Sequence, residues 1–160
     1  SVHDPQNIGS ILRAAECTGA AAVIWSKNRG PQLTAALSKA SAGACELVPW
    51  LRVSNLANAL RQFKQAGFWA VAADLNSESV PLYEFEFSGR TVIVFGSEGA
   101  GVSRLLAEQV DQCVAIPLAG KIDSLNVGQA AAVVLSWARS GLRWCGAPSG
   151  GGCRVGGIGE

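Results

Sequence analysis

Hydrophobic and polar positions along the chain fall into two kinds of block that follow one another in turn. Apolar side chains recur at helical spacing in segments 7–20, 33–46, 55–67, 101–110 and 126–140. Short apolar runs that are typical of strands lie at 21–26, 47–53, 68–75, 91–97 and 113–118. Strands that alternate with helices predict an α/β fold, in which a parallel sheet is flanked by helices.

Glycine and proline refine these boundaries. The clearest amphipathic helix is 55–67, and Gly67 is a suitable end for it, as Gly19 is for the first helix. Gly43 lies inside the second helical segment and weakens that prediction. Pro49 disfavours a central position for the strand at 47–53.

Composition narrows the class of protein. The chain has 160 residues, of which 49% are hydrophobic and 16% charged, so it can form one domain with a sizeable core. No apolar run approaches the roughly 20 residues of a membrane span, and no signal-peptide pattern is visible, so we expect no membrane partner. The five cysteines include no CxxC pair, which favours a reduced, cytoplasmic protein without a structural metal. The net charge of +1 neither supports nor excludes a nucleic-acid partner.

Ligands of open parallel sheets bind beyond the carboxyl ends of the strands, which draws attention to the segment 95–101, FGSEGAG. Its glycines allow backbone to come close to a ligand, but their spacing is not GxGxxG. Glu98 would repel a phosphate, so the loop suits a neutral or positively charged ligand. A tight turn with a solvated glutamate is an equally good interpretation of the loop alone.

Polar residues at two helix starts are the other candidates. Ser124 is a suitable N-cap for the final helix, whereas Asn126 is harder to explain because an otherwise apolar helix begins there. Asn7 is expected to cap or flank the first helix. Arg13 lies on a mostly apolar helix, where an arginine often only extends from the surface into solvent.

Three segments together resemble a known family. DPQNIGSILRAAECTGA (4–20), VIVFGSEGAGVSRLL (92–106) and IPLAGKIDSLNVGQAAAVVL (116–135) are similar to the three motifs of the SpoU (TrmH-type) RNA ribose 2′-O-methyltransferases of the SPOUT superfamily. The stretch 31–60 resembles the subgroup that methylates a guanosine of large-subunit ribosomal RNA.

The resemblance implies a SPOUT fold with a deep trefoil knot in segment 95–140, and a homodimer whose active site lies near the subunit interface. It implies a catalytic domain at 1–143, from which the family's first strand and a separate N-terminal RNA-binding domain are missing. The glycine-rich segment 144–160 is expected to be a flexible tail.

Site residues are carried over from the same motifs. The resemblance assigns the catalytic roles to Asn7, Arg13, Glu98, Ser124 and Asn126. It assigns S-adenosylmethionine binding, largely through backbone groups, to Gly96, Ile116, Leu118 and Leu125. No metal is implied.

The resemblance implies transfer of a methyl group from S-adenosylmethionine to a ribose 2′-hydroxyl of RNA, with a guanosine of 23S-type ribosomal RNA favoured over transfer RNA. Because guanidinium stays protonated in proteins, Arg13 is better suited to stabilise an alkoxide than to act as a base. The alternatives are a transfer-RNA methyltransferase, a catalytically silent RNA-binding module, and a nucleotide-dependent oxidoreductase. The missing GxGxxG disfavours the oxidoreductase.

Overall fold

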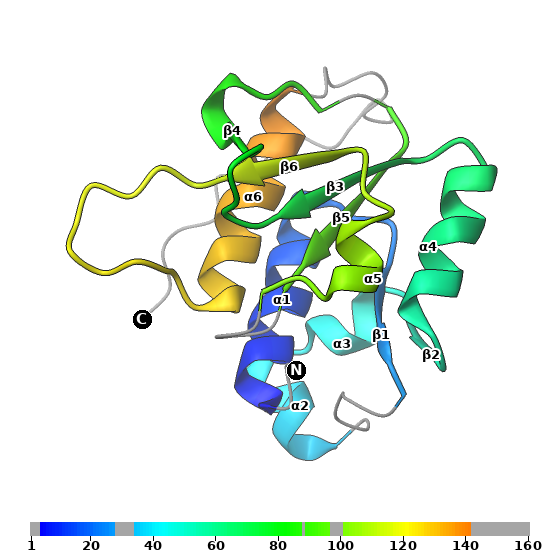
Figure 1. The fold of residues 1–160 in the computed structure, drawn as a ribbon. Coiled ribbons are helices and arrows are strands. Elements are labelled where there is room, and N and C mark those ends of the chain that lie inside the picture. The colour runs from blue at the N-terminus through cyan, green and yellow to red at the C-terminus, as the bar shows by residue number, and fades with distance from the viewer. Residues whose placement is uncertain (1–3, 28–33, 88, 97–100, 142–160) are drawn as a thin grey trace, which may run out of the picture.

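The computed structural model describes residues 4–27, 34–87, 89–96 and 101–141 (Figure 1). The glycine-rich tail therefore lies outside the described residues. The helices are α1 (Pro5–Thr18), α2 (Ala35–Ala40), α3 (Ala44–Leu47), α4 (Leu56–Gln65), α5 (Arg104–Ala107) and α6 (Val127–Gly141). Within the described ranges, none of the helices is both long and apolar enough to span a bilayer.

The strands form a two-stranded and a four-stranded sheet among the described residues, and every pairing is parallel. The small sheet pairs β1 (Val23–Ser26) with β2 (Trp50–Val53). The larger sheet has the order β4-β6-β3-β5, made of β3 (Trp69–Ala73), β4 (Val80–Pro81), β5 (Thr91–Phe95) and β6 (Gln112–Ala115). The predicted α/β class with parallel strands flanked by helices is thus confirmed.

Several predicted boundaries need correction. The helix expected at 33–46 is two short helices, because Ala42 and Gly43 have φ angles of 50° and 83°. Residues with a left-handed backbone conformation cannot continue a right-handed helix. The short strand β4 and the 3-10 turn η1 (Leu82–Glu84) were not predicted. Gly19 ends α1 in the left-handed conformation, as expected.

The first helix begins earlier than its apolar pattern indicates. Asp4 is its N-cap, since its Oδ1 accepts a hydrogen bond from the amide of Gln6 at 3.0 Å, and Pro5 occupies the first helical turn. The expectation that Asn7 caps the helix is therefore wrong. Asn7 lies inside the first turn of α1.

The last helix contributes to both hydrophobic clusters of the described residues. One cluster packs α1 against α2, α3 and β1 around the fully buried Leu12 and Leu37, with Leu135 of α6 packed against it. The other packs α6 against the larger sheet through Val134 and Val71. Figure 1 shows α1 and α6 side by side. The helix α6 therefore joins the two parts of the core.

Asp111 fastens the amino end of the larger sheet to α4. One carboxylate oxygen accepts a hydrogen bond from Lys64 Nζ at 2.7 Å, and the other accepts one from the amide of Ala70 at 2.8 Å. Partial burial alone would raise the pKa of Asp111. The hydrogen bonds from Lys64 and Ala70 outweigh burial and lower the pKa below its usual value of 3.8.

Asp111→Asn should lower the free energy of unfolding at pH 7 by on the order of 1 kcal/mol. A carboxylate with a lowered folded-state pKa stabilises the fold above its unfolded pKa, and this contribution is lost as the pH falls through the folded pKa. The difference between Asp111→Asn and the wild type should therefore shrink below about pH 4. Urea denaturation at pH 7 and pH 3 measures the free energy of unfolding of both proteins.

Glu108→Gln is the matched control, because the ion pair between Glu108 and Arg104 is exposed. An equal difference at both pH values would contradict the assignment.

Candidate functional site

Two of the predicted cofactor positions lie at the carboxyl edge of the four-stranded sheet. Gly96 follows the end of β5 and Ile116 follows the end of β6. Both strands pair with β3, which lies between them. Since β3 lies between them, β5 and β6 are two strand spacings apart, which is about 10 Å. The structure thus brings Gly96 and Ile116 to one edge, on either side of the end of β3.

Gly96 lies where the chain makes close contact with itself. A Cβ added at Gly96 would lie 2.3 Å from the carbonyl carbon of Gly101 and 2.6 Å from the amide nitrogen of Val102. Only glycine fits this contact without a shift of the backbone. The two ends of the loop in the second motif therefore meet at Gly96. Glu98, the predicted acid of this loop, lies outside the described residues.

Sequence reasoning missed Asp74, which follows the central strand β3. Its Oδ2 accepts a hydrogen bond from the amide of Val102 at 3.1 Å, and its Oδ1 accepts one from the amide of Leu75 at 3.0 Å. Asp74 therefore links the end of β3 to the chain just after Gly101. An acidic residue directly after a buried strand was the available signal.

The segment between β6 and α6 extends away from the body of the molecule, as the yellow loop in Figure 1 shows. It carries three other predicted site residues, Ser124, Leu118 and Leu125, all of which are exposed. The exposed fractions of the two leucines are 43% and 37%. Because exposed leucines gain from contact with an apolar ring, they are suitable groups for the rim of a nucleoside site.

Asn126 connects the start of α6 to α1. Its side-chain oxygen accepts a hydrogen bond from the amide of Gly128 at 2.8 Å, and its carbonyl accepts one from the amide of Ala130 at 2.9 Å. Asn126 is therefore the N-cap of α6, and the expectation that Ser124 caps this helix is wrong because α6 begins at Val127. The Nδ2 of Asn126 also donates a hydrogen bond to Asn7 Oδ1 at 2.7 Å.

Close packing of α1 against α6 makes this amide pair possible. A Cβ added at Gly128 would lie 2.6 Å from the Cβ of Ser10 and 3.1 Å from Asn126 Oδ1. A larger residue at this position would push the two helices apart. The structure thus brings together Asn7 of the first motif and Asn126 of the third, which are 119 residues apart in the sequence.

Arg13 is on a different face of α1 from this pair. It follows Asn7 by six residues, which turns its side chain by about 240° around the helix and moves it about 9 Å along the axis. Arg13 is exposed, whereas Asn7 is half-buried against α6. The helix therefore does not direct Arg13 toward the Asn7–Asn126 pair of the same chain. Among the described residues, no group of three or more metal-ligating side chains occurs.

Known proteins and a family model are similar in sequence to most of this chain. The model of the SpoU rRNA Methylase family matches residues 1–136. The 23S rRNA (guanosine-2′-O-)-methyltransferase RlmB of Pseudomonas syringae is 42% identical over 134 residues, which are 84% of this chain and 53% of that protein. The RlmB of Escherichia coli K12 is 40% identical over 84% of this chain and 55% of that protein. The chain thus spans about half the length of these relatives.

Solved structures with the same fold come from the same group of proteins. An S-adenosylmethionine-bound rRNA methyltransferase from Sinorhizobium meliloti has a TM-score of 0.80 at 31% identity, over 88% of this chain and 53% of that one. A TrmH/SpoU tRNA modifying enzyme from A. aeolicus has a TM-score of 0.80 at 29% identity, over 88% and 71%. From the family-model match and the 42% identity, we conclude that the chain belongs to the SpoU rRNA methylase family.

Proposed function

We propose that the chain transfers a methyl group from S-adenosylmethionine to the 2′-hydroxyl of an RNA ribose. The observation that carries the proposal is the 2.7 Å hydrogen bond between Asn7 and Asn126, which joins two motifs that are far apart in the sequence. Gly96 and Ile116 share the carboxyl edge of the four-stranded sheet. The names of the relatives support a guanosine of 23S-type ribosomal RNA as the target.

The residues at this edge fit S-adenosylmethionine. Gly96 and Ile116 are half-buried and follow directly after strands, so their backbone groups lie beyond the ends of the ladder. The exposed Leu118 and Leu125 offer apolar surface for an adenine ring. A methyltransferase of the same fold was solved with the cofactor bound. When bound, the cofactor supplies a methyl group on a sulfonium, which is a good leaving group.

The chain's own residues must then activate and orient a weak oxygen nucleophile. Arg13 remains protonated and stabilises the negative charge that develops on the ribose oxygen. Asn7, Asn126 and Ser124 orient the ribose through hydrogen bonds. Glu98 is assigned to the same task from the sequence motif. This division of roles requires no proton transfer to Arg13: the 2′-hydroxyl proton would pass to solvent as the methyl group moves from sulfur to oxygen, and S-adenosylhomocysteine would leave as the other product.

A homodimer supplies Arg13 to this site. Since Arg13 lies on another face of α1, a second copy of the chain must bring its guanidinium to the Asn7–Asn126 pair. We assign the outer face of α6 to the dimer contact. Sedimentation velocity at micromolar concentration should show a dimer, and an active monomer would contradict this assignment.

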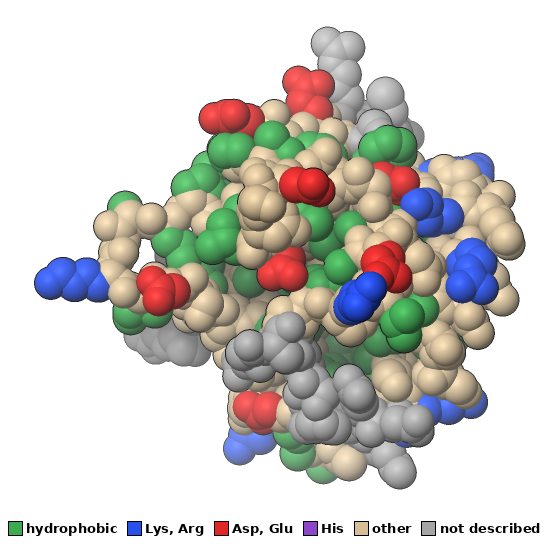
Figure 2. Space-filling view, in the orientation of Figure 1, with side chains coloured by type: hydrophobic (Ala, Val, Ile, Leu, Met, Phe, Trp, Pro, Cys, Tyr) green, Lys and Arg blue, Asp and Glu red, His purple; other side chains and the backbone are tan. Residues whose placement is uncertain are grey.

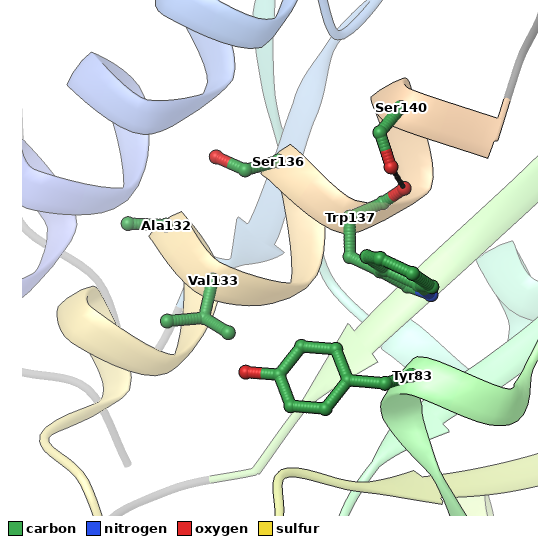
Figure 3. Close-up of a pocket in the computed structure, with 6 residues that line it drawn as sticks. All are labelled: Tyr83, Ala132, Val133, Ser136, Trp137 and Ser140. Carbon is green, nitrogen blue, oxygen red and sulfur yellow. Dashed lines mark hydrogen bonds between the residues drawn. The ribbon is translucent and has the colours of Figure 1, made fainter.

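The outer face of α6 has a shallow apolar groove of about 540 Å³ (Figure 3). Figure 3 shows Val133 and Trp137 of α6 facing Tyr83 of η1. The rings of Tyr83 and Trp137 make an edge-to-face contact with centroids 5.3 Å apart. The groove shares no residue with the predicted cofactor edge. An apolar surface rimmed by Ser136 and Ser140 is suited to contact with another protein chain.

The distribution of charged side chains on the surface affects how the protein can bind RNA. Figure 2 shows acidic and basic side chains interspersed over the described part of the face that carries the sheet. A surface of mixed sign attracts phosphates only at short range. We therefore assign RNA recognition to local contacts, with the dimer presenting two sites.

Three finer features complete the proposal. Segment 95–140 forms the family's deep trefoil knot. Residues 1–143 are the catalytic domain, followed by the tail at 144–160. The protein acts in the cytoplasm, where ribosomal RNA is modified. Membership of the SpoU family and the order of the three motifs support these assignments.

Methyl transfer from radiolabelled S-adenosylmethionine tests the proposed function directly. Unmodified large-subunit ribosomal RNA and total transfer RNA serve as parallel substrates. We expect label on a guanosine ribose of the ribosomal RNA, mapped by primer extension. Label confined to transfer RNA would overturn the target, and binding of the cofactor without transfer to either RNA would overturn the activity.

A further inference from the structure

The carboxyl edge of the larger sheet has an acidic residue that the proposed reaction does not use. Asp74 follows β3, the strand that lies between β5 and β6. It is therefore placed between Gly96 and Ile116, the two positions assigned to the cofactor. Its side chain is only partly exposed.

The contacts of Asp74 hold one particular piece of backbone. Its Oδ2 accepts a hydrogen bond from the amide of Val102 at 3.1 Å, across 28 residues of sequence. The same carboxylate lies 3.1 Å and 3.3 Å from the position of a Cβ added at Gly101. Gly101 has a φ of 62°, so a side chain there would be strained as well as crowded. Asp74 thus contacts the Gly101–Val102 peptide, and glycine at 101 accommodates this close contact without strain.

That peptide is the same one that contacts Gly96. The nearest atoms to a Cβ added at Gly96 are the carbonyl carbon of Gly101 and the amide nitrogen of Val102, at 2.3 Å and 2.6 Å. A chain of contacts therefore runs from the Asp74 carboxylate through the Gly101–Val102 peptide to the backbone of Gly96. If the peptide moves, the backbone of Gly96 loses its support.

The backbone of Asp74 is itself held in place by hydrogen bonds. Its amide donates to the carbonyl of Val114 in β6 at 3.1 Å, and its carbonyl accepts from Ser79 Oγ at 2.8 Å. Ser79 Oγ also accepts from the amide of Asn76, which closes the turn after β3. The carboxylate is therefore presented from a rigid strand end. A fixed acceptor orients the amide that it binds.

We infer that Asp74 is a positioning residue for S-adenosylmethionine: it holds the Gly101–Val102 peptide against Gly96 and so sets the backbone that binds the cofactor. The inference rests on the proposed function. It assigns to Asp74 no contact with RNA and no part in the chemical step. Loss of the carboxylate should therefore weaken cofactor binding without slowing methyl transfer at saturating cofactor.

The test compares Asp74→Ala with Asp111→Ala. Both wild-type carboxylates accept a backbone amide from a distant segment, but Asp111 binds Ala70 at the opposite end of β3. By isothermal titration with S-adenosylhomocysteine, Asp74→Ala should raise the dissociation constant about tenfold, as expected for loss of one charge-assisted hydrogen bond. Asp111→Ala should leave the dissociation constant within about twofold, although it lowers the melting temperature.

Kinetics provide a readout that general destabilisation would not change in the same way. Asp74→Ala should raise the KM for S-adenosylmethionine about tenfold and leave kcat within about twofold. Asp74→Asn keeps one neutral acceptor and should raise the KM only about threefold. If Asp74→Ala does not fold, Asp74→Asn decides alone, and an unchanged KM contradicts the inference.

Two outcomes separate this inference from the proposed function. If the folded wild type does not bind S-adenosylhomocysteine at millimolar concentration, the proposed function is wrong. If the wild type binds but Asp74→Ala binds equally well, only the positioning role of Asp74 is wrong. Equal weakening by Asp74→Ala and Asp111→Ala would also overturn the positioning role, because it would show a loss of stability alone.

Discussion

Gly96→Val should raise the dissociation constant for S-adenosylhomocysteine at least about tenfold, equivalent to about 1.4 kcal/mol. The Cβ alone would lie 2.3 Å from the Gly101 carbonyl carbon, closer than real Cβ atoms approach a backbone atom. The backbone at the end of β5 must therefore shift, and the groups assigned to the cofactor shift with it. Isothermal titration measures the change in affinity, and thermal denaturation shows whether the variant folds.

Gly141→Val is the matched control for this substitution. Gly141 ends α6, and apart from its chain neighbours and the backbone of its own helix turn, no atom of the described residues lies within 4 Å of a Cβ added there. This variant introduces the same side chain without crowding, so its affinity should equal that of the wild type. Wild-type affinity in a folded Gly96→Val protein would remove Gly96 from the cofactor site.

Arg13→Ala should slow methyl transfer by about a hundredfold or more, if Arg13 stabilises the developing alkoxide. The free energy of unfolding should change by no more than about 0.5 kcal/mol, because Arg13 is exposed. Affinity for the cofactor should be unchanged, since the guanidinium faces the ribose. Single-turnover methylation with saturating cofactor and RNA is the decisive measurement.

Two further variants define the role of Arg13. Arg13→Lys keeps the positive charge but loses the planar fork, so partial activity indicates electrostatic stabilisation and near-complete loss indicates bidentate positioning. Arg61→Ala is the control, because Arg61 is also an exposed arginine within a helix. Equal rates in Arg13→Ala and the wild type would leave Glu98 and Asn126 as the candidates.

Periodicity predicted the order of the main elements because each one buries one face. The helix at 56–65 and the strand at 69–73 follow directly from their apolar positions and from Gly67. The break at Ala42 was not predictable in this way, because alanine is a strong helix former and rarely has a positive φ. The caps were misplaced because Asp4 and Asn7, or Ser124 and Asn126, are equally suitable residue types that lie close together.

The candidate site was predictable only through resemblance. No local pattern indicates that Asn7 and Asn126 form a hydrogen bond, because 119 residues separate them. Gly128 lies within a helix, where glycine is unfavourable. Only the structure explains why glycine is needed there, because a Cβ would clash with Ser10 of α1. Asp74 was missed although it directly follows a buried strand, because the sequence does not identify the backbone amide that its carboxylate binds.

The position of α6 has a consequence for synthesis of the protein. Leu135 completes the cluster around α1, and Val134 completes the cluster on the larger sheet, so neither core is closed before the last helix has been made. During translation, the apolar faces of α1 and of the sheet remain exposed until residues 127–141 leave the ribosome. Contacts between α1 and α6, which are far apart in the sequence, also slow folding, since a long loop must close first. A ribosome that synthesises this chain therefore carries exposed apolar surface until α6 has been made, and chaperones are suited to shield such a nascent chain.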